Sequence, residues 1–224
     1  MKYYPIFMRL SGRRCVVVGG GAVALQKVRG LLEVGGAVTV ISPDLTGELQ
    51  QLKLEGRIEH VGRRYERGDV AGFFVAFAAT GDGEVDRQID DDAADANVLL
   101  NVVDQPQRCD FISPSVVTRD DLIIAISTSG ASPAMARQLR EKLEAEIGPE
   151  YALALHLLGR LRRRLKELDT PAAQRNKIFN QLVDSPLLEL LRGGRFDDVD
   201  ALITDTAGAE FSLRQLDIDW STAP

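Results

Sequence analysis

Short apolar runs alternate with amphipathic stretches through the first half of the chain. In the amphipathic stretches, which begin at 22, 45 and 84, apolar residues recur every three or four positions, the spacing of one helix face. The apolar runs have the length and β-branched composition of strands, and they span 15–18, 37–41, 58–61, 73–79 and 98–103. This alternation predicts a mostly parallel sheet with right-handed crossovers.

The pattern changes after residue 113. Two short apolar runs, 115–118 and 122–127, are joined by a charged turn, which is typical of a hairpin. A helix is expected from Pro133, because proline suits the first turn of a helix. Its apolar residues are Met135, Leu139, Leu143 and Ile147. The glycine and proline that follow at 148 and 149 should end it.

The rest of the chain is expected to be helical. The helical stretches are 151–168, 171–183 and a shorter one at 187–191, and the tail beyond Asp205 is weakly patterned. We therefore expect three parts, which are a sheet domain of 1–113, a small α+β segment of 114–148 and a helical domain of 149–224. The alternative is a single continuous domain with a long helical arm at its carboxyl end.

Charge and composition narrow the class of protein. With 33 acidic and 27 basic residues the net charge is −6, which argues against a nucleic-acid-binding protein, because such a protein needs a basic face for phosphates. Two cysteines are too few for a disulfide framework or a structural zinc site. No apolar run approaches the roughly 20 residues needed to cross a bilayer, and the amino end shows no secretory signal. We expect a soluble, cytoplasmic protein that binds neither nucleic acid nor a membrane.

A glycine-rich turn follows the first predicted strand. Residues 19–24 read Gly-Gly-Gly-Ala-Val-Ala and match G-x-G-x-x-A between a strand and a helix, the context that this motif requires. The first glycine permits the tight turn, the second lets the backbone approach a pyrophosphate, and the last small residue keeps the helix near the strand. Exposed amides at the helix start favour phosphate. The alternative is a turn without a ligand. The expected dinucleotide contacts are Gly19, Gly21, Ala22, Val23 and Ala24.

The end of the second predicted strand indicates which dinucleotide is expected. An acidic residue at this place would bind the ribose hydroxyls of NAD. Asp44 comes slightly late for that role, but no Arg or Lys follows the strand to receive a 2′-phosphate. We therefore expect a Rossmann-type domain that binds NAD rather than NADP. The residues expected near the ribose are Ser42, Pro43 and Asp44.

Several segments together resemble those of one enzyme family. They are Pro-Ile-Phe at 5–7, Val-Val-Val-Gly-Gly-Gly at 16–21, Asn-Val-Val-Asp at 101–104, Phe-Ile-Ser-Pro-Ser at 111–115, Thr-Ser-Gly-Ala-Ser-Pro at 128–133 and Leu-Arg-Glu-Lys-Leu-Glu at 139–144. In this order they resemble the amino-terminal half of sirohaem synthase and its stand-alone relatives, the precorrin-2 dehydrogenase/sirohydrochlorin ferrochelatase family. The helical remainder of the chain fits more loosely.

The resemblance implies an enzyme that oxidises precorrin-2 to sirohydrochlorin with NAD. Many members then insert ferrous iron, as a substrate, to give sirohaem. The resemblance also implies a homodimer assembled through 114–148, which makes that part a dimerisation segment. The expected fold is α/β, with a mostly parallel NAD-binding sheet, the dimerisation segment and a helical carboxyl-terminal domain. Larger relatives carry a uroporphyrinogen methyltransferase domain, and since this chain ends at 224 we expect that activity elsewhere.

Asp104 is the candidate catalytic residue. It follows the strand 98–103 at the carboxyl edge of the sheet, where doubly wound sheets bind ligands. A carboxylate there could accept a pyrrole or ring-carbon proton as a hydride leaves, and could assist metal entry. Local chemistry alone favours an aspartate that caps the loop before Pro106. The resemblance favours catalysis, because the family's proposed acid-base aspartate occupies this place.

The hydroxyl-rich segment before Pro133 has two interpretations. Its side chains could cap the following helix, or they could donate hydrogen bonds to substrate carboxylates. Precorrin-2 is rich in carboxylates and this protein is acidic, so binding requires a local basic surface. The candidate substrate-binding residues are Thr128, Ser129, Gly130, Ser132, Arg137 and Arg140, to which Arg119 and Lys142 could add charge. A second basic run, 160–166, is better explained as a solvated helix face or a dimer surface.

The histidines and cysteines predict no bound metal. His60 and His156 have no ligand spacing; His60 lies in a predicted strand and is expected to be structural, while His156 could face the substrate. Cys15 is expected in the core. Cys109 follows Asp104, and a place near the site and a packing role suit it equally. Iron would therefore be a substrate.

Two alternatives stay open at this point. The first is a dehydrogenase without chelatase activity, which would use the same scaffold; iron and cobalt are likewise not separated by the sequence. The second is of another class, a dimeric regulatory module that senses NAD. Such a module needs the glycine loop but has no reason for Asp104 or for the segment 129–133.

Overall fold

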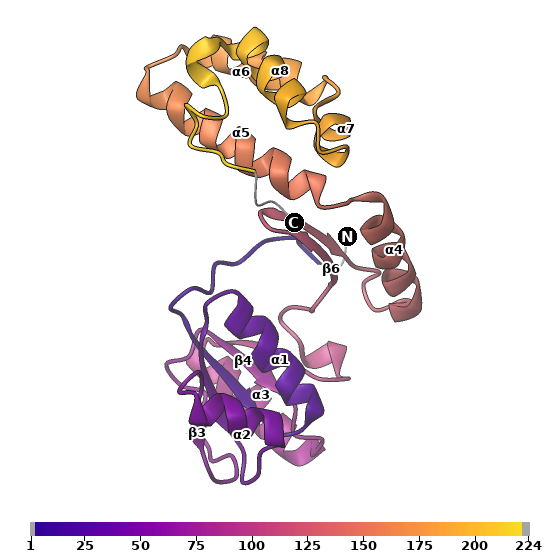
Figure 1. Cartoon of the computed structure of the whole chain (residues 1–224). Helices are drawn as coiled ribbons and strands as arrows, with labels where there is room; N and C mark the ends of the chain where they lie inside the picture. Colours follow the sequence, from indigo (N-terminus) through magenta and orange to yellow (C-terminus); the bar gives the residue numbers. More distant parts are fainter. Residues whose placement is uncertain (1–2, 221–224) are drawn as a thin grey trace. The chain divides into compact units, whose positions relative to one another are not determined.

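The computed structural model describes residues 3–220, and the chain divides into two compact units (Figure 1). The first unit runs to Ser113 and the second begins at Pro114. Each unit has a hydrophobic core of its own. A second boundary at 148 stays a prediction.

The first unit is built on a five-stranded parallel sheet with the strand order β3-β2-β1-β4-β5. The strands are β1 (Arg14–Val18), β2 (Ala37–Ile41), β3 (Glu59–Val61), β4 (Val75–Ala78) and β5 (Leu99–Val102). The order reverses between β1 and β4, and open sheets of this kind bind ligands beyond the carboxyl ends of the strands at such a point. The expected parallel, Rossmann-type sheet is confirmed.

Helices cover both faces of this sheet (Figure 1). Helices α1 (Ala22–Glu33) and α2 (Gly47–Leu54) pack on one face, where Val17 shares a core with residues of α1. Helix α3 (Gly83–Ala96) packs on the other face, where Val16 shares a core with residues of α3. Because neighbouring residues of a buried strand face opposite cores, the inner strands β1 and β4 are apolar at every buried position, which explains the runs seen in the sequence.

One predicted strand begins later than expected. The apolar run from Phe73 was expected to be strand throughout, but β4 begins at Val75. The guanidinium of Arg14 lies 4.4 Å from the centre of the Phe73 ring. That of Arg13 lies 4.8 Å from the centre of the Phe74 ring. Each phenylalanine ring thus lies against an arginine side chain, and the Phe74 amide donates to the Arg14 carbonyl at 2.8 Å just before the strand begins. An apolar run alone does not reveal where the strand begins.

The helix ends follow local rules. Helix α1 is followed by Gly35 with a φ of 74°, a conformation that glycine adopts without strain, and the Gly36 amide donates to the Leu31 carbonyl at 2.9 Å. At the start of α3 the Asp82 carboxylate accepts from the amides of Glu84 and Val85. The end of α1 thus leads to the amino edge of the sheet, where β2 begins, and the start of α3 lies at the carboxyl edge, after β4.

The second unit begins with the hairpin of β6 (Ser115–Arg119) and β7 (Leu122–Ile126), followed by helix α4 (Pro133–Glu146). Val117 of the hairpin and Ala136 of α4 are buried. Arg119 donates from Nε to the Ile147 carbonyl at 2.8 Å and from Nη2 to the Glu144 carbonyl at 2.9 Å. The hairpin is thus tied to the end of α4.

The remaining helices form the core of the second unit. They are α5 (Glu150–Glu167), α6 (Ala172–Val183), α7 (Leu187–Arg192) and α8 (Phe196–Ala207). Helix α8 extends past Asp205, where the sequence predicts only a weakly patterned tail. The tail then contributes Phe211, Leu216 and Ile218 to the core from a 3-10 turn and bends. Apolar residues in such turns lack a regular period, so the pattern analysis missed them.

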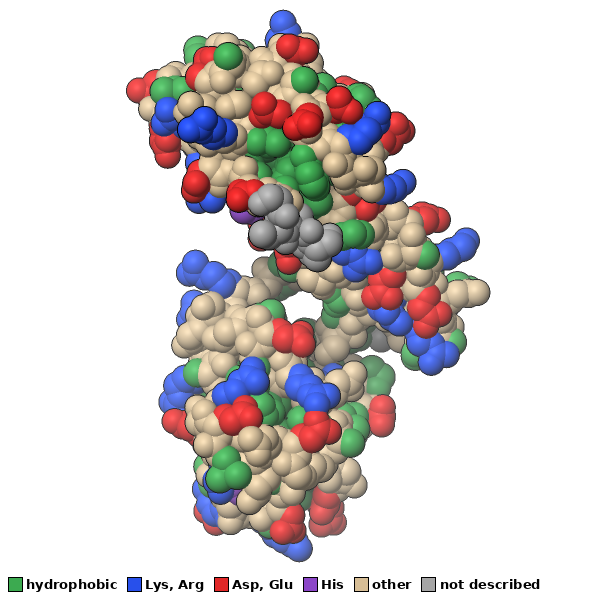
Figure 2. All heavy atoms as spheres, viewed as in Figure 1, with side chains coloured by type: hydrophobic (Ala, Val, Ile, Leu, Met, Phe, Trp, Pro, Cys, Tyr) green, Lys and Arg blue, Asp and Glu red, His purple; other side chains and the backbone are tan. Residues whose placement is uncertain are grey.

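Charges of both signs lie side by side on the surface. On the face in Figure 2, Lys and Arg side chains alternate with Asp and Glu side chains over both units. Among the helices formed by residues 3–220, none is long and apolar enough to span a bilayer.

Candidate nucleotide-binding and active site

The glycine turn begins with a close backbone approach. Gly19 follows β1 with a φ of 122°, which L-residues with a side chain rarely adopt. A Cβ atom there would lie 2.3 Å from the Ala79 carbonyl oxygen. Gly19 therefore allows the ends of β1 and β4 to lie together, as expected of the first glycine.

Gly20 is also required, although the motif leaves its position free. A Cβ atom on Gly20 would lie 1.9 Å from the Asp44 carbonyl oxygen and 2.7 Å from Ser42 Oγ. The Thr46 amide donates to the Gly20 carbonyl at 2.9 Å. The loop after β2 is thus pressed against the glycine turn, and only glycine fits between them.

Gly21 faces open space. It precedes α1, and among residues 3–220 no atom beyond its two chain neighbours lies within 4 Å of where its Cβ would be, nor does any side chain cap this helix end. Free amides at a helix start attract an anion, and the space over Gly21 lets one approach. Ala24 is fully buried and holds α1 close to the sheet. The turn therefore fits the pyrophosphate of a dinucleotide.

A hollow of about 430 Å³ lies at this edge of the sheet. Of the residues predicted from the sequence, it brings together Gly21, Ala22, Val23 and Asp104. Its full lining is Gly21, Ala22, Val23, Ala78, Ala79, Thr80, Gly81, Gly83, Asp86, Val103, Asp104 and Gln105. The glycine turn and the candidate catalytic aspartate thus border one cavity.

The residues predicted to lie near the ribose do not line this hollow. Ser42 is buried, and its carbonyl oxygen lies 2.8 Å from His60 Nε2, while Lys53 Nζ lies 3.1 Å from His60 Nδ1. His60 therefore holds the loop after β2, in agreement with the structural role expected for it. Pro43 and Asp44 are exposed. They stand beside Gly20, at the edge of the glycine turn.

Asp104 is exposed at the mouth of the hollow. It lies two residues after β5 and has a φ of 58°, a left-handed conformation that is uncommon for a residue with a side chain. The Gln105 amide donates to the Val102 carbonyl at 3.3 Å, so the turn is closed around Asp104. Aspartate adopts this conformation more readily than most residues, because its short polar side chain can hydrogen-bond the local backbone.

The structure adds a residue that the sequence analysis missed. Asp86 of α3 is 4% exposed and lines the hollow. Its carboxylate accepts from Thr80 Oγ1 at 2.6 Å and from Gln105 Nε2 at 3.0 Å. Asp86 therefore joins the loop after β4 to the loop after β5, and both of these loops border the hollow.

Cys109 holds the loop after Asp104. Its Sγ accepts from the Val102 amide at 3.2 Å and lies 3.2 Å from the Val102 carbonyl oxygen. Burial raises the pKa of the Cys109 thiol above its usual value. The Asn101 side chain donates to the Phe111 carbonyl at 2.9 Å, which fixes the same loop. These contacts support the packing role for Cys109.

The hydroxyl-rich segment of the second unit caps α4. Ser132 Oγ accepts from the Met135 amide at 3.2 Å, and Thr128 Oγ1 accepts from the Ser132 amide at 3.1 Å. Ser129 and Gly130 have φ angles of 54° and 85° and form an exposed turn. The capping interpretation is thus realised for Ser132, and substrate binding by this segment stays a prediction.

Several of the basic side chains considered for substrate carboxylates have partners close by. Arg137 lies 4.0 Å from Glu141, and Arg140 lies 2.6 Å from Glu144 along the same helix. Arg119 donates to the carbonyls at the end of α4. In the run 160–166, Arg160 pairs with Asp217 and Arg164 with Glu167. Their roles toward a substrate stay predictions.

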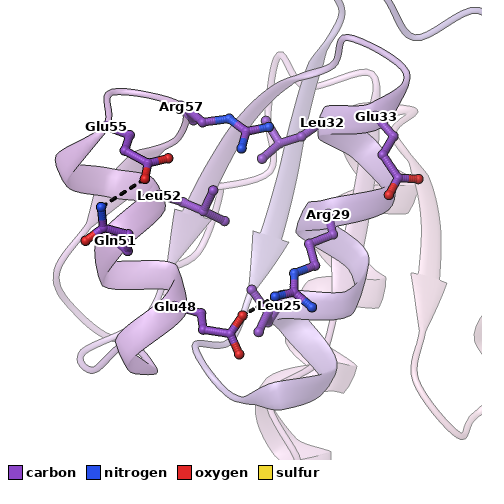
Figure 3. A pocket seen from close by; sticks show the side chains of 9 residues that line it. All are labelled: Leu25, Arg29, Leu32, Glu33, Glu48, Gln51, Leu52, Glu55 and Arg57. Carbon is purple, nitrogen blue, oxygen red and sulfur yellow. Dashed lines mark hydrogen bonds and ion pairs between the residues drawn. The ribbon is translucent and has the colours of Figure 1, made fainter.

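A second hollow lies on the face of the sheet covered by α1 and α2. It measures about 410 Å³, and none of the residues predicted from the sequence lines it. Figure 3 shows Arg29 and Glu48 joined by an ion pair across it, and Gln51 donating to Glu55 along α2. It is a surface groove between α1 and α2, lined by charged side chains together with Leu25, Leu32 and Leu52. Among residues 3–220, no group of His, Cys, Asp or Glu side chains could hold a metal ion.

Known proteins match the chain in both units. Residues 6–115 match a family described as putative NAD(P)-binding, and residues 119–146 match the family of the sirohaem biosynthesis protein central region. The sirohaem synthase of Thioalkalivibrio sulfidiphilus is 39% identical over 88% of this chain, and that of Photobacterium profundum is also 39% identical over 88% of it. The chain is a homologue of the sirohaem synthases. It spans about two fifths of the length of these relatives, 40% and 42%.

The fold of this sirohaem synthase homologue also matches a solved structure. The structure of SirC, a precorrin-2 dehydrogenase, superposes with a TM-score of 0.75 at 23% identity, and the match covers 89% of this chain and 98% of that one. The likeness extends over both units and supports the observed fold. The dinucleotide domain and the helical region therefore occur together in another protein.

Proposed function

We propose that the protein oxidises precorrin-2 to sirohydrochlorin with NAD as the oxidant. The observation that carries this proposal is the placement of Asp104 at the mouth of a hollow that the glycine turn also borders. The relatives are named sirohaem synthases, and the solved structure with the same fold is named a precorrin-2 dehydrogenase. Both names fit a site that joins a dinucleotide turn to a carboxylate.

The glycine turn would hold the cofactor. The amides that begin α1 at Ala22 and Val23 face the hollow and would bind the pyrophosphate. Asp44 is exposed beside Gly20 and would bind the ribose hydroxyls. No Lys or Arg lies between Ser42 and Glu48 to bind a 2′-phosphate, which favours NAD over NADP. When bound, NAD supplies a hydride acceptor.

Asp104 would handle the proton. Oxidation of the macrocycle removes a hydride and a proton, and the proton needs a base within reach of the ring. The Asp104 carboxylate is exposed, borders the hollow and is held by a closed turn. It would accept the proton from a pyrrole nitrogen or a ring carbon and release it to water after the product leaves.

The second unit would bind the periphery of the substrate. We propose that the exposed turn at Ser129 and Gly130 offers backbone amides to substrate carboxylates, and that nearby cations add charge. The candidates are Thr128, Ser129, Gly130, Ser132, Arg137 and Arg140. The ion pairs of the two arginines with acidic residues of α4 would exchange for pairs with the substrate.

Insertion of ferrous iron into sirohydrochlorin is the second proposed activity. The chelatase step requires a base for the two pyrrole protons that the metal displaces, and Asp104 would serve again. Iron would be a substrate here. A dehydrogenase without this step is the alternative. We further propose a homodimer and a cytoplasmic location, the latter because Cys15 and Cys109 are both free thiols.

Anaerobic turnover tests the main proposal. The protein is incubated with precorrin-2 and NAD, absorbance is followed, and ferrous iron is then added. We expect NAD-dependent formation of sirohydrochlorin, followed by conversion to sirohaem faster than the spontaneous reaction. A protein that binds NAD but gives no product would instead be an NAD-sensing module. Formation of sirohydrochlorin without faster metal insertion would mean that the protein is a dehydrogenase only.

Two variants assign the residues. Asp104→Asn should abolish most turnover while NAD affinity stays unchanged, and Asp91→Asn, an exposed change on α3, serves as its matched control. Gly21→Asp should abolish NAD binding, because its carboxylate would occupy the space over the turn. Turnover at the wild-type rate in Asp104→Asn would remove Asp104 from the mechanism.

A further inference from the structure

Lys27 is a half-buried cation beside the proposed active site. It lies on α1 one turn after Val23, and residues four apart share one face of a helix. Val23 lines the hollow together with Asp104. Lys27 therefore lies on the same side of α1 as Val23, which borders the hollow.

The ammonium of Lys27 has a defined position. Its Nζ donates to Ser113 Oγ at 3.3 Å and lies 5.6 Å from the centre of the Phe77 ring. Phe77 packs edge-to-face against Phe111, with ring centres 5.4 Å apart. The loop that carries Phe111 and Ser113 is held by the Asn101 side chain. The ammonium is thus fixed between α1 and this loop.

No carboxylate neutralises this cation within the part of the chain that is described. Lys27 forms no ion pair there, and its hydrogen bond goes to the neutral hydroxyl of Ser113. Burial lowers the pKa of Lys27, an effect that the nearby Cys109 and Asp104 oppose. A partly desolvated charge without an ion-pair partner is costly, whereas a neutral side chain of this length would pack on Phe77 at no such cost.

We infer that Lys27 and Ser113 form a subsite that binds one peripheral carboxylate of the tetrapyrrole, next to Asp104. An ammonium has three donors, so Nζ can bind a carboxylate oxygen and keep its bond to Ser113. The serine hydroxyl can rotate to donate to the same carboxylate. The subsite would place one edge of the ring at a fixed distance from the base. This inference rests on the proposed function.

Binding of uroporphyrin tests the subsite without turnover. This porphyrin carries acetate and propionate groups like those of precorrin-2, and its fluorescence reports binding. Lys27→Met removes the charge and keeps the length of the side chain, and Lys27→Arg restores the charge. Arg29→Met is the matched control, because it removes one exposed positive charge from the same helix. The affinity of each variant for NAD is measured in parallel.

We expect Lys27→Met to weaken uroporphyrin binding and to raise the KM for precorrin-2, each about tenfold, which corresponds to one charge-assisted contact. NAD affinity should not change, and Lys27→Arg should bind within about threefold of the wild type. Wild-type affinity for uroporphyrin in Lys27→Met would overturn the subsite alone. A wild-type protein that binds neither uroporphyrin nor precorrin-2 would overturn the proposed function together with the subsite.

Discussion

The three consecutive glycines differ in what surrounds them. Gly19 and Gly20 press against the loops after β4 and β2, whereas Gly21 faces only the space expected for a ligand. A methyl group on Gly20 would collide with the Asp44 carbonyl oxygen, while one on Gly21, whose φ is −86°, would meet no protein atom. The same substitution should therefore affect folding at one position and binding at the other.

We expect Gly20→Ala to lower the free energy of unfolding by about 2 kcal/mol, since backbone must move to relieve the contact. NAD affinity should fall at least about tenfold, because the moved loop carries Asp44. Gly21→Ala should lose NAD affinity but keep its stability to within about 0.5 kcal/mol. Thermal unfolding and calorimetric titration with NAD separate the two effects. A Gly20→Ala protein as stable as the wild type would show that the two loops do not touch.

Asp86 offers a second prediction for a single residue. In Asp86→Asn an NH2 group replaces one carboxylate oxygen, so the side chain can no longer accept hydrogen bonds from both Thr80 and Gln105. We therefore expect the free energy of unfolding to fall by about 1–3 kcal/mol. Asp90→Asn on the same helix removes a half-exposed ion pair with Arg108 and should cost less than about 1 kcal/mol. Chemical denaturation measures both. Equal losses of stability in the two variants would contradict the role of Asp86 in joining the loops after β4 and β5.

The sequence predicted the parts of the site that depend on consecutive residues. Gly19 and Gly21 could be assigned because a motif fixes their spacing, and Asp104 because it follows a recognisable strand and a familiar segment. Asp86 and Lys27 could not be assigned. Their partners, Gln105 and Ser113, lie 19 and 86 residues away along the chain, and no local pattern records such contacts.

At the scale of elements, the sheet was the most predictable part. Strands buried on both faces are apolar without interruption, and glycines or capping residues mark the helix ends. Helix α8 and the buried turn at Phe211 were harder to recognise, because tertiary packing decides their structure and their apolar residues lack a long regular period. The start of β4 was expected two residues too early, because Phe73 and Phe74 continue the apolar run although they precede the strand.

A buried carboxylate fixes the start of α5 to α7. Glu150 is 3% exposed, and its Oε1 accepts from Arg192 Nη2 at 2.6 Å and from the Gly148 amide at 3.3 Å. Burial opposes the ionisation of Glu150, but the hydrogen bonds from Arg192 and Gly148 outweigh it and hold the pKa of this carboxyl below its usual value. The pair therefore stabilises the fold when Glu150 is ionised.

The pH dependence of this contact has a definite sign. Because the pKa of Glu150 is lowered by folding, its contribution is present above the unfolded-state pKa, about 4.5, and is lost as the pH falls through the folded-state value. Arg192→Met should lower the free energy of unfolding at pH 7, and this loss should shrink near pH 3. Thermal unfolding at both pH values measures it. A cost that is the same at both pH values would mean that packing, and not charge, is responsible.

At the scale of the whole molecule, the second unit exposes apolar side chains on the hairpin and on α4 that its own core does not use. Val117 of the hairpin is buried, while Val116 and Ile123 on the opposite face are 38% and 47% exposed. On α4, Met135 and Leu139 are 50% and 40% exposed. A two-stranded sheet is marginally stable by itself, so an apolar outer face of this kind favours association with another surface. The proposed homodimer would bury it.

Charged substitutions on this surface should therefore dissociate the dimer. We expect the wild-type protein to have twice the chain mass by light scattering after gel filtration, and Ile123→Glu and Leu139→Glu to shift it to the mass of one chain. Both side chains are partly exposed within a single chain, so an unfolded variant is not expected, and circular dichroism checks this. Val183→Glu, a 67% exposed apolar position at the end of α6, is the control and should stay dimeric. A dimer that persists in both variants would place the interface elsewhere. A monomeric wild-type protein would contradict the proposed homodimer.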